Sequence, residues 1–69
     1  MPVSTIELLD FEAAYPRHTG AKEVAIREQL GLTPARFYQL LVRAAASMEG
    51  QQHDPMTARR VREGRRRVA

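Results

Sequence analysis

The side chains that could take part in acid–base or metal chemistry are few in this chain and widely spaced. His18 and His53 are its only imidazoles, and both fall in stretches where we expect loops. A metal site needs several converging ligands, and no short spacing of His, Asp or Glu supplies them. Glu7, Asp10 and Glu12 are spaced so that they spread around an exposed helix face instead of pairing for proton transfer. We therefore expect no metal, no cofactor and no enzymatic activity.

Motifs of nucleotide-binding and hydrolytic enzymes are also missing from the sequence. It contains no GxGxxG, no phosphate-binding loop and no Ser/His/Asp set. A domain of 69 residues is expected to offer no deep cleft, so we expect no small-molecule substrate. The chain has no cysteine, which excludes a disulfide framework and is compatible with a reducing compartment.

A second group of side chains has the chemistry of DNA recognition and lies within residues 23–43, EVAIREQLGLTPARFYQLLVR. Arg36 can bind guanine O6 and N7, and Gln39 can bind adenine. Ala35 is small enough to let a helix approach the bases. The hydroxyl groups of Thr33 and Tyr38 can reach phosphates. The DNA-binding residues predicted here are Thr33, Ala35, Arg36, Tyr38, Gln39 and Arg43, together with Lys22.

These side chains are positioned by a helix, a three-residue turn and a longer helix, which is the helix-turn-helix pattern. Residues 21–30 predict the first helix. Gly31 suits the positive φ of the turn, and Leu32 should fill the angle between the helices. Thr33 followed by proline is a typical helix start, and the second helix should run to about Met48. Its buried stripe is predicted to comprise Phe37, Leu40, Leu41, Ala44 and Met48.

The flanking segments predict two more helices. Ser4 and Glu7 form a capping box before a helix over 5–15, and residues 16–20 are expected to connect it to the next helix. Gly50 is expected to end the recognition helix in a polar loop over 49–53.

After Asp54 and Pro55, residues 56–68 predict a fourth helix. It should be regular to about Glu63 and fray beyond. Only Met56 and Val61 are candidates for packing from this segment.

Charge is concentrated at the C-terminal end. Five basic and six acidic side chains lie in residues 1–50, whereas residues 51–69 carry six arginines against two acids. Arginine presents a planar donor fork that suits phosphate oxygens, so polyanion binding is the natural interpretation. The alternative is a solvated tail kept for solubility. The arginines predicted to contact DNA are Arg59, Arg60, Arg62, Arg65, Arg66 and Arg67.

The fold class predicted from these signals is all-α, with a three-helix core that contains the helix-turn-helix and a basic C-terminal helix or tail. Residues 1–50 form the predicted helix-turn-helix domain and residues 51–69 the basic segment. The longest apolar run, 40–46, is too short to span a membrane, and residues 4–15 carry three acids where a secretory signal would be apolar. We expect a cytoplasmic protein with no membrane partner.

The segments LLDFE, GAKEVAIREQLGLTPARFYQLL and DPMTARRVR resemble a family of short actinobacterial helix-turn-helix proteins catalogued as a domain of unknown function. The core is also similar to the DNA-binding part of sigma factors. The resemblance implies DNA binding. In one respect the chain departs from the pattern, because such motifs usually have alanine where this chain has Arg27. A snorkelling Arg27 or a one-residue rotation that uses Ala25 would each accommodate this departure.

Double-stranded DNA is the partner that these observations favour, and a transcriptional regulator is the predicted function. A single recognition helix reaches few base pairs, so a homodimer or a larger partner would be needed for specificity. The alternative is an adaptor of the transcription machinery that docks through the acidic first helix or the Phe37–Tyr38 pair. A plain helical bundle whose polar face meets water is the structural alternative. RNA binding is disfavoured because no stacking platform is present.

Overall fold

Helices account for nearly all of residues 3–68, the part of the chain that the computed structural model describes, with side chains described for residues 3–64. No strand occurs in this part of the chain, so the predicted all-α class is confirmed. The elements in chain order are α1 (Thr5–Ala14), α2 (Gly20–Ala25), the π-helical turn η1 (Ile26–Leu30), α3 (Pro34–Ala46), α4 (Met48–His53) and α5 (Pro55–Val68).

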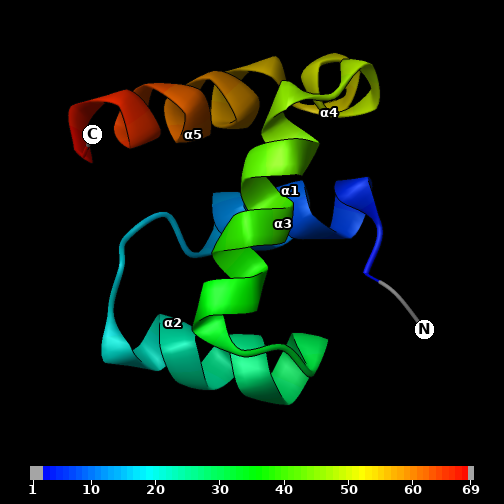
Figure 1. The fold of residues 1–69 in the computed structure, drawn as a ribbon. Helices are drawn as coiled ribbons and strands as arrows, with labels where there is room; N and C mark the ends of the chain where they lie inside the picture. Colours follow the sequence, from blue (N-terminus) through cyan, green and yellow to red (C-terminus); the bar gives the residue numbers. More distant parts are fainter. Residues whose placement is uncertain (1–2, 69) are drawn as a thin grey trace.

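Helix α3 runs through the middle of the molecule, and the other helices pack around it (Figure 1). Helix α2 and η1 lie across its N-terminal end, whereas α4 and α5 lie at its C-terminal end, and α1 packs against its side. The two ends of α3 are therefore packed against different helices. No helix in the described residues has the length and apolar character needed to cross a membrane.

Helix starts follow the capping signals of the sequence. The Ser4 hydroxyl accepts from the Glu7 backbone N–H at 3.1 Å, and the Glu7 carboxylate accepts from the Ser4 N–H at 3.1 Å, so the predicted capping box is confirmed. Thr33 caps α3 by accepting from the Arg36 N–H at 3.2 Å, with Pro34 at the first helical position. These caps fix where α1 and α3 begin.

The predicted second helix forms but changes its winding partway. It begins as α2 and continues as η1, whose wider turn shifts the register of the side chains that follow. Ala25 and Ile26 are buried and Arg27 is exposed. Arg27 therefore lies outside the packed side of this helix. Gly31 then ends η1 with φ 67°, the left-handed conformation predicted for the turn.

The end of α3 differs from the prediction. Ser47 has an extended conformation and its hydroxyl accepts from the Gly50 N–H at 3.0 Å, so Ser47 ends α3 and caps a new helix, α4. The predicted continuation to Met48 and the polar loop over 49–53 are wrong. Met48 is 73% exposed instead of buried. Gly50 lies inside α4, where a Cβ would collide with the Ala44 carbonyl oxygen. Its role is close packing and not helix termination.

The core is shared by all the helices except α4, and α5 is part of it. Leu9, Ile26, Phe37 and Ala45 have no exposed surface, and neither does Ala58 of α5. The sequence offered Met56 and Val61 as the two candidates for core packing in α5. Val61 does pack against the core, whereas Met56 is exposed. Helix α5 also continues to Val68 instead of fraying after Glu63.

Candidate functional site

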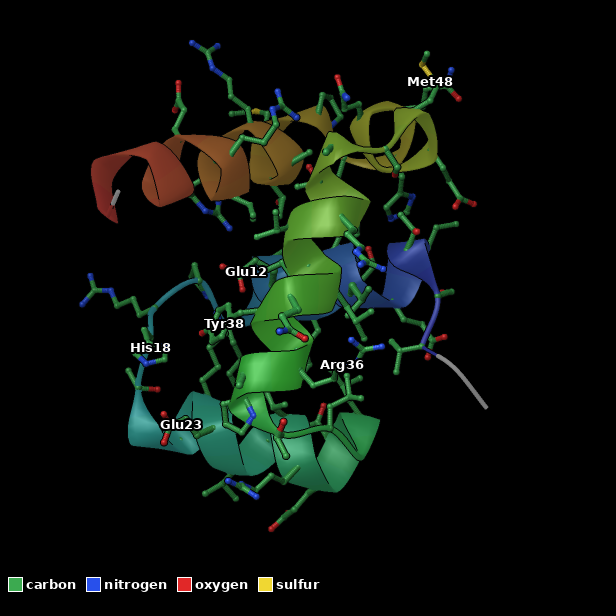
Figure 2. All side chains as sticks on the ribbon, in the orientation of Figure 1. Glu12, His18, Glu23, Arg36, Tyr38 and Met48 are labelled. Carbon is green, nitrogen blue, oxygen red and sulfur yellow. The ribbon has the colours of Figure 1, made fainter. Side chains whose placement is uncertain are left out.

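Five of the predicted DNA-binding residues lie exposed on or just before α3. Arg36, Gln39 and Arg43 follow the three-and-four spacing of one helix face, and Arg36 Nη1 donates to Gln39 Oε1 at 3.3 Å. Thr33 and Ala35 are exposed at the N-terminal end of the same helix. Figure 2 shows Arg36 directed away from the helix axis. We call this surface the α3 face, made of Thr33, Ala35, Arg36, Gln39 and Arg43.

Tyr38 does not belong to the α3 face, contrary to the prediction that it points outward with Arg36. At 3.6 residues per turn it lies about 200° around the helix from Arg36. It is half-buried, its phenol oxygen is 2.7 Å from His18 Nδ1, and its ring packs edge-on against Phe37. The ring also lies 5.1 Å from Lys22 Nζ. Tyr38 therefore joins α3 to the segment before α2.

Lys22 was predicted to face solvent and contact DNA, but its side chain is buried. Its ammonium donates to Glu12 Oε1 at 2.5 Å and lies 5.6 Å from the Phe37 ring centroid. The side chains of Lys22 and Glu12 are 2% and 9% exposed. Glu12 was likewise expected on an exposed face. Each charge is kept in the interior by the other, and the aromatic rings add cation–π attraction.

The arginines of α5 have separate roles. Arg62 is half-buried, and its Nη1 donates to the Ala45 carbonyl oxygen at 2.9 Å, which satisfies one of the free carbonyls at the end of α3. Arg59 pairs with Glu63 at 3.1 Å on the surface. Arg60 is exposed and carries no such contact among the described side chains. The remaining predicted contacts, Arg65, Arg66 and Arg67, have side chains outside the described residues.

The groups assigned to an adaptor surface are engaged within the chain. Glu7 is used in the cap of α1, Glu12 is buried, and Asp10 Oδ1 lies 2.7 Å from His53 Nε2. Phe37 has no exposed surface. Glu12 and the aromatic pair thus serve the packing of the fold, whereas Glu7 and Asp10 stay on the surface in contacts with other residues of the chain.

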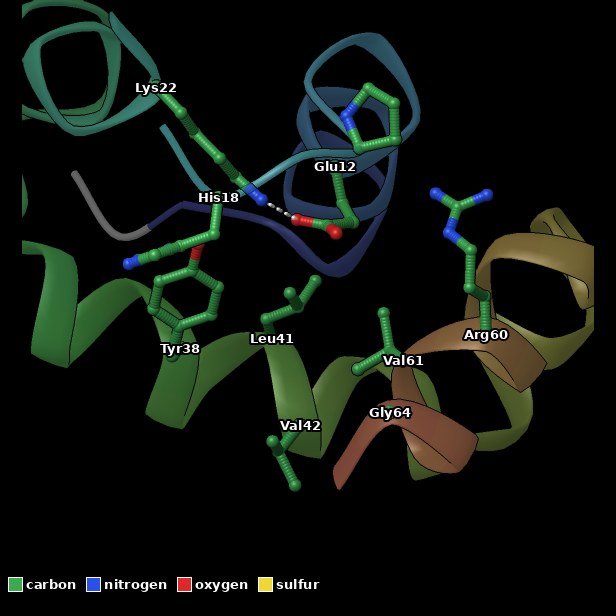
Figure 3. Close-up of a pocket in the computed structure, with 10 residues that line it drawn as sticks. Glu12, His18, Lys22, Tyr38, Leu41, Val42, Arg60, Val61 and Gly64 are labelled. Atoms are coloured by element: carbon green, nitrogen blue, oxygen red, sulfur yellow. Dashed lines mark hydrogen bonds and ion pairs between the residues drawn. The ribbon is translucent and has the colours of Figure 1, made fainter. Parts of the chain in front are cut away.

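An open groove lies on the other side of α3, whereas the length of the chain predicted only that there would be no deep cleft. Its volume is about 690 Å³, and it is bounded by α1, the segment before α2, α2, α3 and α5 (Figure 3). Leu41 and Val61 line it with apolar surface, and the Lys22–Glu12 pair lies at its wall. The groove could not be located from the sequence because these elements are brought together only by tertiary packing. The one local signal of this surface was the apolar Val61 followed three residues later by the small Gly64.

The fold and these surfaces define a small helical protein with a polar face on its central helix and an apolar groove behind it. The chain belongs to the family described as protein of unknown function (DUF3263), which matches residues 2–69. No curated protein and no solved structure matches the chain.

Proposed function

We propose that the chain is a DNA-binding helix-turn-helix protein in which α3 enters the major groove. The observation that carries the proposal is the exposed α3 face, placed directly after a left-handed glycine turn and a threonine cap. Helix-turn-helix proteins contact base edges through the N-terminal residues of the second helix. Arg36 and Gln39 occupy that position here.

The residue types of the α3 face fit this docking. Ala35 presents only a methyl group, so the helix can approach the bases closely. Arg36 and Gln39 bind each other across one turn, and both would exchange that weak exposed contact for base edges. Arg43 lies two turns further along, where phosphates border the groove. Helix α3 is 13 residues long, about 20 Å, which exceeds the width of the major groove.

Phosphate contacts come from a smaller set than the arginine content suggests. Lys22 and Arg62 are committed within the fold and leave the set. Arg59 is held only by an exposed ion pair, so it is free to exchange partners. Arg65, Arg66 and Arg67 complete the basic end on sequence grounds. We propose a cytoplasmic transcriptional regulator that pairs as a homodimer, because one α3 face spans few base pairs.

Selection of bound sites from a pool of random duplexes tests base readout. If a preferred site emerges, Arg36→Ala and Gln39→Ala should each cost roughly 1–3 kcal/mol on it and relax preference at one position. Arg27→Ala is the control, because Arg27 is exposed on η1 and outside the α3 face. It should weaken all duplexes alike or none. Equal losses on selected and random duplexes for both α3 variants would remove base readout.

A further inference from the structure

We propose that the groove behind α3 binds a small amphipathic carboxylate, an anion with an apolar body of fatty-acyl or aromatic type. This site lies apart from the α3 face, so the inference goes beyond the proposed DNA contact. Tyr38 borders the groove, and Figure 2 shows it on the opposite side of α3 from Arg36. Occupying one surface leaves the other open.

The apolar body is specified by the lining of the groove. Leu41 and Val42 of α3 and Val61 of α5 line it (Figure 3), and Pro16 of the segment before α2 also lines it. A groove of about 690 Å³ lies in the range that small-molecule sites occupy, roughly 300–1,000 Å³. Its walls come from five parts of the chain, namely α1, the segment before α2, α2 itself, α3 and α5.

The charge of the ligand follows from the polar and charged groups that line the groove. Glu12 and Lys22 neutralise each other at its wall, with their ammonium–carboxylate contact at 2.5 Å. His18 at the rim lies 3.7 Å from Glu23. Arg60 is exposed at the groove and has no carboxylate partner among the described side chains. Together with hydrogen bonds from Thr57, Arg60 helps to lower the pKa of Asp54 but forms no ion pair with it, so its guanidinium fork is available to bind a carboxylate in a bidentate manner.

The shape of the site orients the ligand. Figure 3 shows Arg60 at one side of the groove and Tyr38 with His18 at the other, with Leu41 and Val61 between them. A carboxylate at Arg60 thus directs the apolar body along the aliphatic wall towards the Tyr38 ring. A cationic head group would meet Arg60 and be repelled.

Calorimetric titration with three ligands that share a decyl chain separates the effect of head-group charge from that of hydrophobicity. Decanoate, decanol and decyltrimethylammonium are each titrated into the full chain below their micelle-forming concentrations. Decanoate should bind roughly tenfold more tightly than decyltrimethylammonium, with decanol between them. Arg60→Gln should remove the advantage of decanoate over decanol. Arg59→Gln is the matched control, since Arg59 lies outside this groove and pairs with Glu63, and it should keep that advantage.

A blocking variant tests the location of the site. Gly64 lines the groove, and a Cβ built there meets nothing within 4 Å, so Gly64→Leu adds a side chain to open space. Because glycine weakens a helix, Gly64→Leu should make helix α5 more stable. A loss of binding by this variant therefore cannot be attributed to unfolding. Gly64→Ala is the control. Decanoate affinity should fall roughly tenfold in Gly64→Leu. Equal affinity for the three ligands, no binding of decanoate, or full binding by Gly64→Leu would each overturn the proposal.

Discussion

Removing the Lys22 ammonium should destabilise the protein more than any surface charge change. The pair with Glu12 is almost fully enclosed, with the two side chains 2% and 9% exposed. Lys22→Met keeps the apolar stem but leaves a carboxylate buried without its partner, which costs about 3–5 kcal/mol. A domain of this length has a total stability of about 3–10 kcal/mol. The variant should therefore lose a large share of its free energy of unfolding.

Urea unfolding followed by circular dichroism measures this loss, and a double variant makes the reasoning specific. Lys22→Met combined with Glu12→Leu removes both charges, and replacing a buried pair with apolar groups is often neutral or stabilising. The double variant should recover most of the stability that Lys22→Met loses. Arg59→Ala breaks an exposed pair and should cost less than about 1 kcal/mol. A double variant as unstable as Lys22→Met alone would refute the account of the pair.

Three further predictions concern the packing, the turn and a cap. Gly50→Ala should destabilise by about 1–3 kcal/mol because its Cβ would collide with a backbone carbonyl of α3, whereas Gly64→Ala, in open space, should stabilise slightly; thermal melts compare the two. Gly31→Val should lower the melting temperature, since a β-branched residue is strongly disfavoured at φ 67°, and an unchanged melt would contradict the left-handed turn. Hydrogen bonds from the Thr57 side chain and backbone lower the pKa of Asp54 below 3.8, so its stabilisation is complete above that pH and is lost as the pH falls through the lowered value. Asp54→Asn should make stability less dependent on pH in that acidic range. Urea midpoints measured over a pH series check this, and an equal or steeper pH dependence in the variant would contradict it.

Features encoded by neighbouring residues could be predicted from the sequence. The caps of Ser4 and Thr33 need only residues three positions away, and the turn at Gly31 needs only its own backbone. The exposed α3 face followed from the helix period once its apolar stripe was located. Ser47 was the missed local signal, because its cap of the Gly50 N–H starts α4 where the pattern of apolar residues predicted a continuing helix.

Contacts between distant segments could not be predicted in this way. Lys22 and Glu12 are ten residues apart and on different helices, so helical spacing gives no reason to pair them. Arg62 reaches the carbonyl of Ala45 only because α5 packs against the end of α3. Lys22 and Arg62 were both predicted to contact DNA because they are charged. Charge does not reveal whether a side chain is already bonded within the fold. The groove depends on the same packing.

Salt titration of duplex binding by the full chain tests the central claim most directly. Fluorescence anisotropy of a labelled duplex should show binding at low salt, with log affinity falling linearly against log salt by about 0.9 for each phosphate contacted. Arg36→Ala and Arg43→Ala should weaken that binding, whereas Lys22, being buried, should contribute no contact of its own. A full chain that binds no duplex even at low salt would contradict DNA binding by α3.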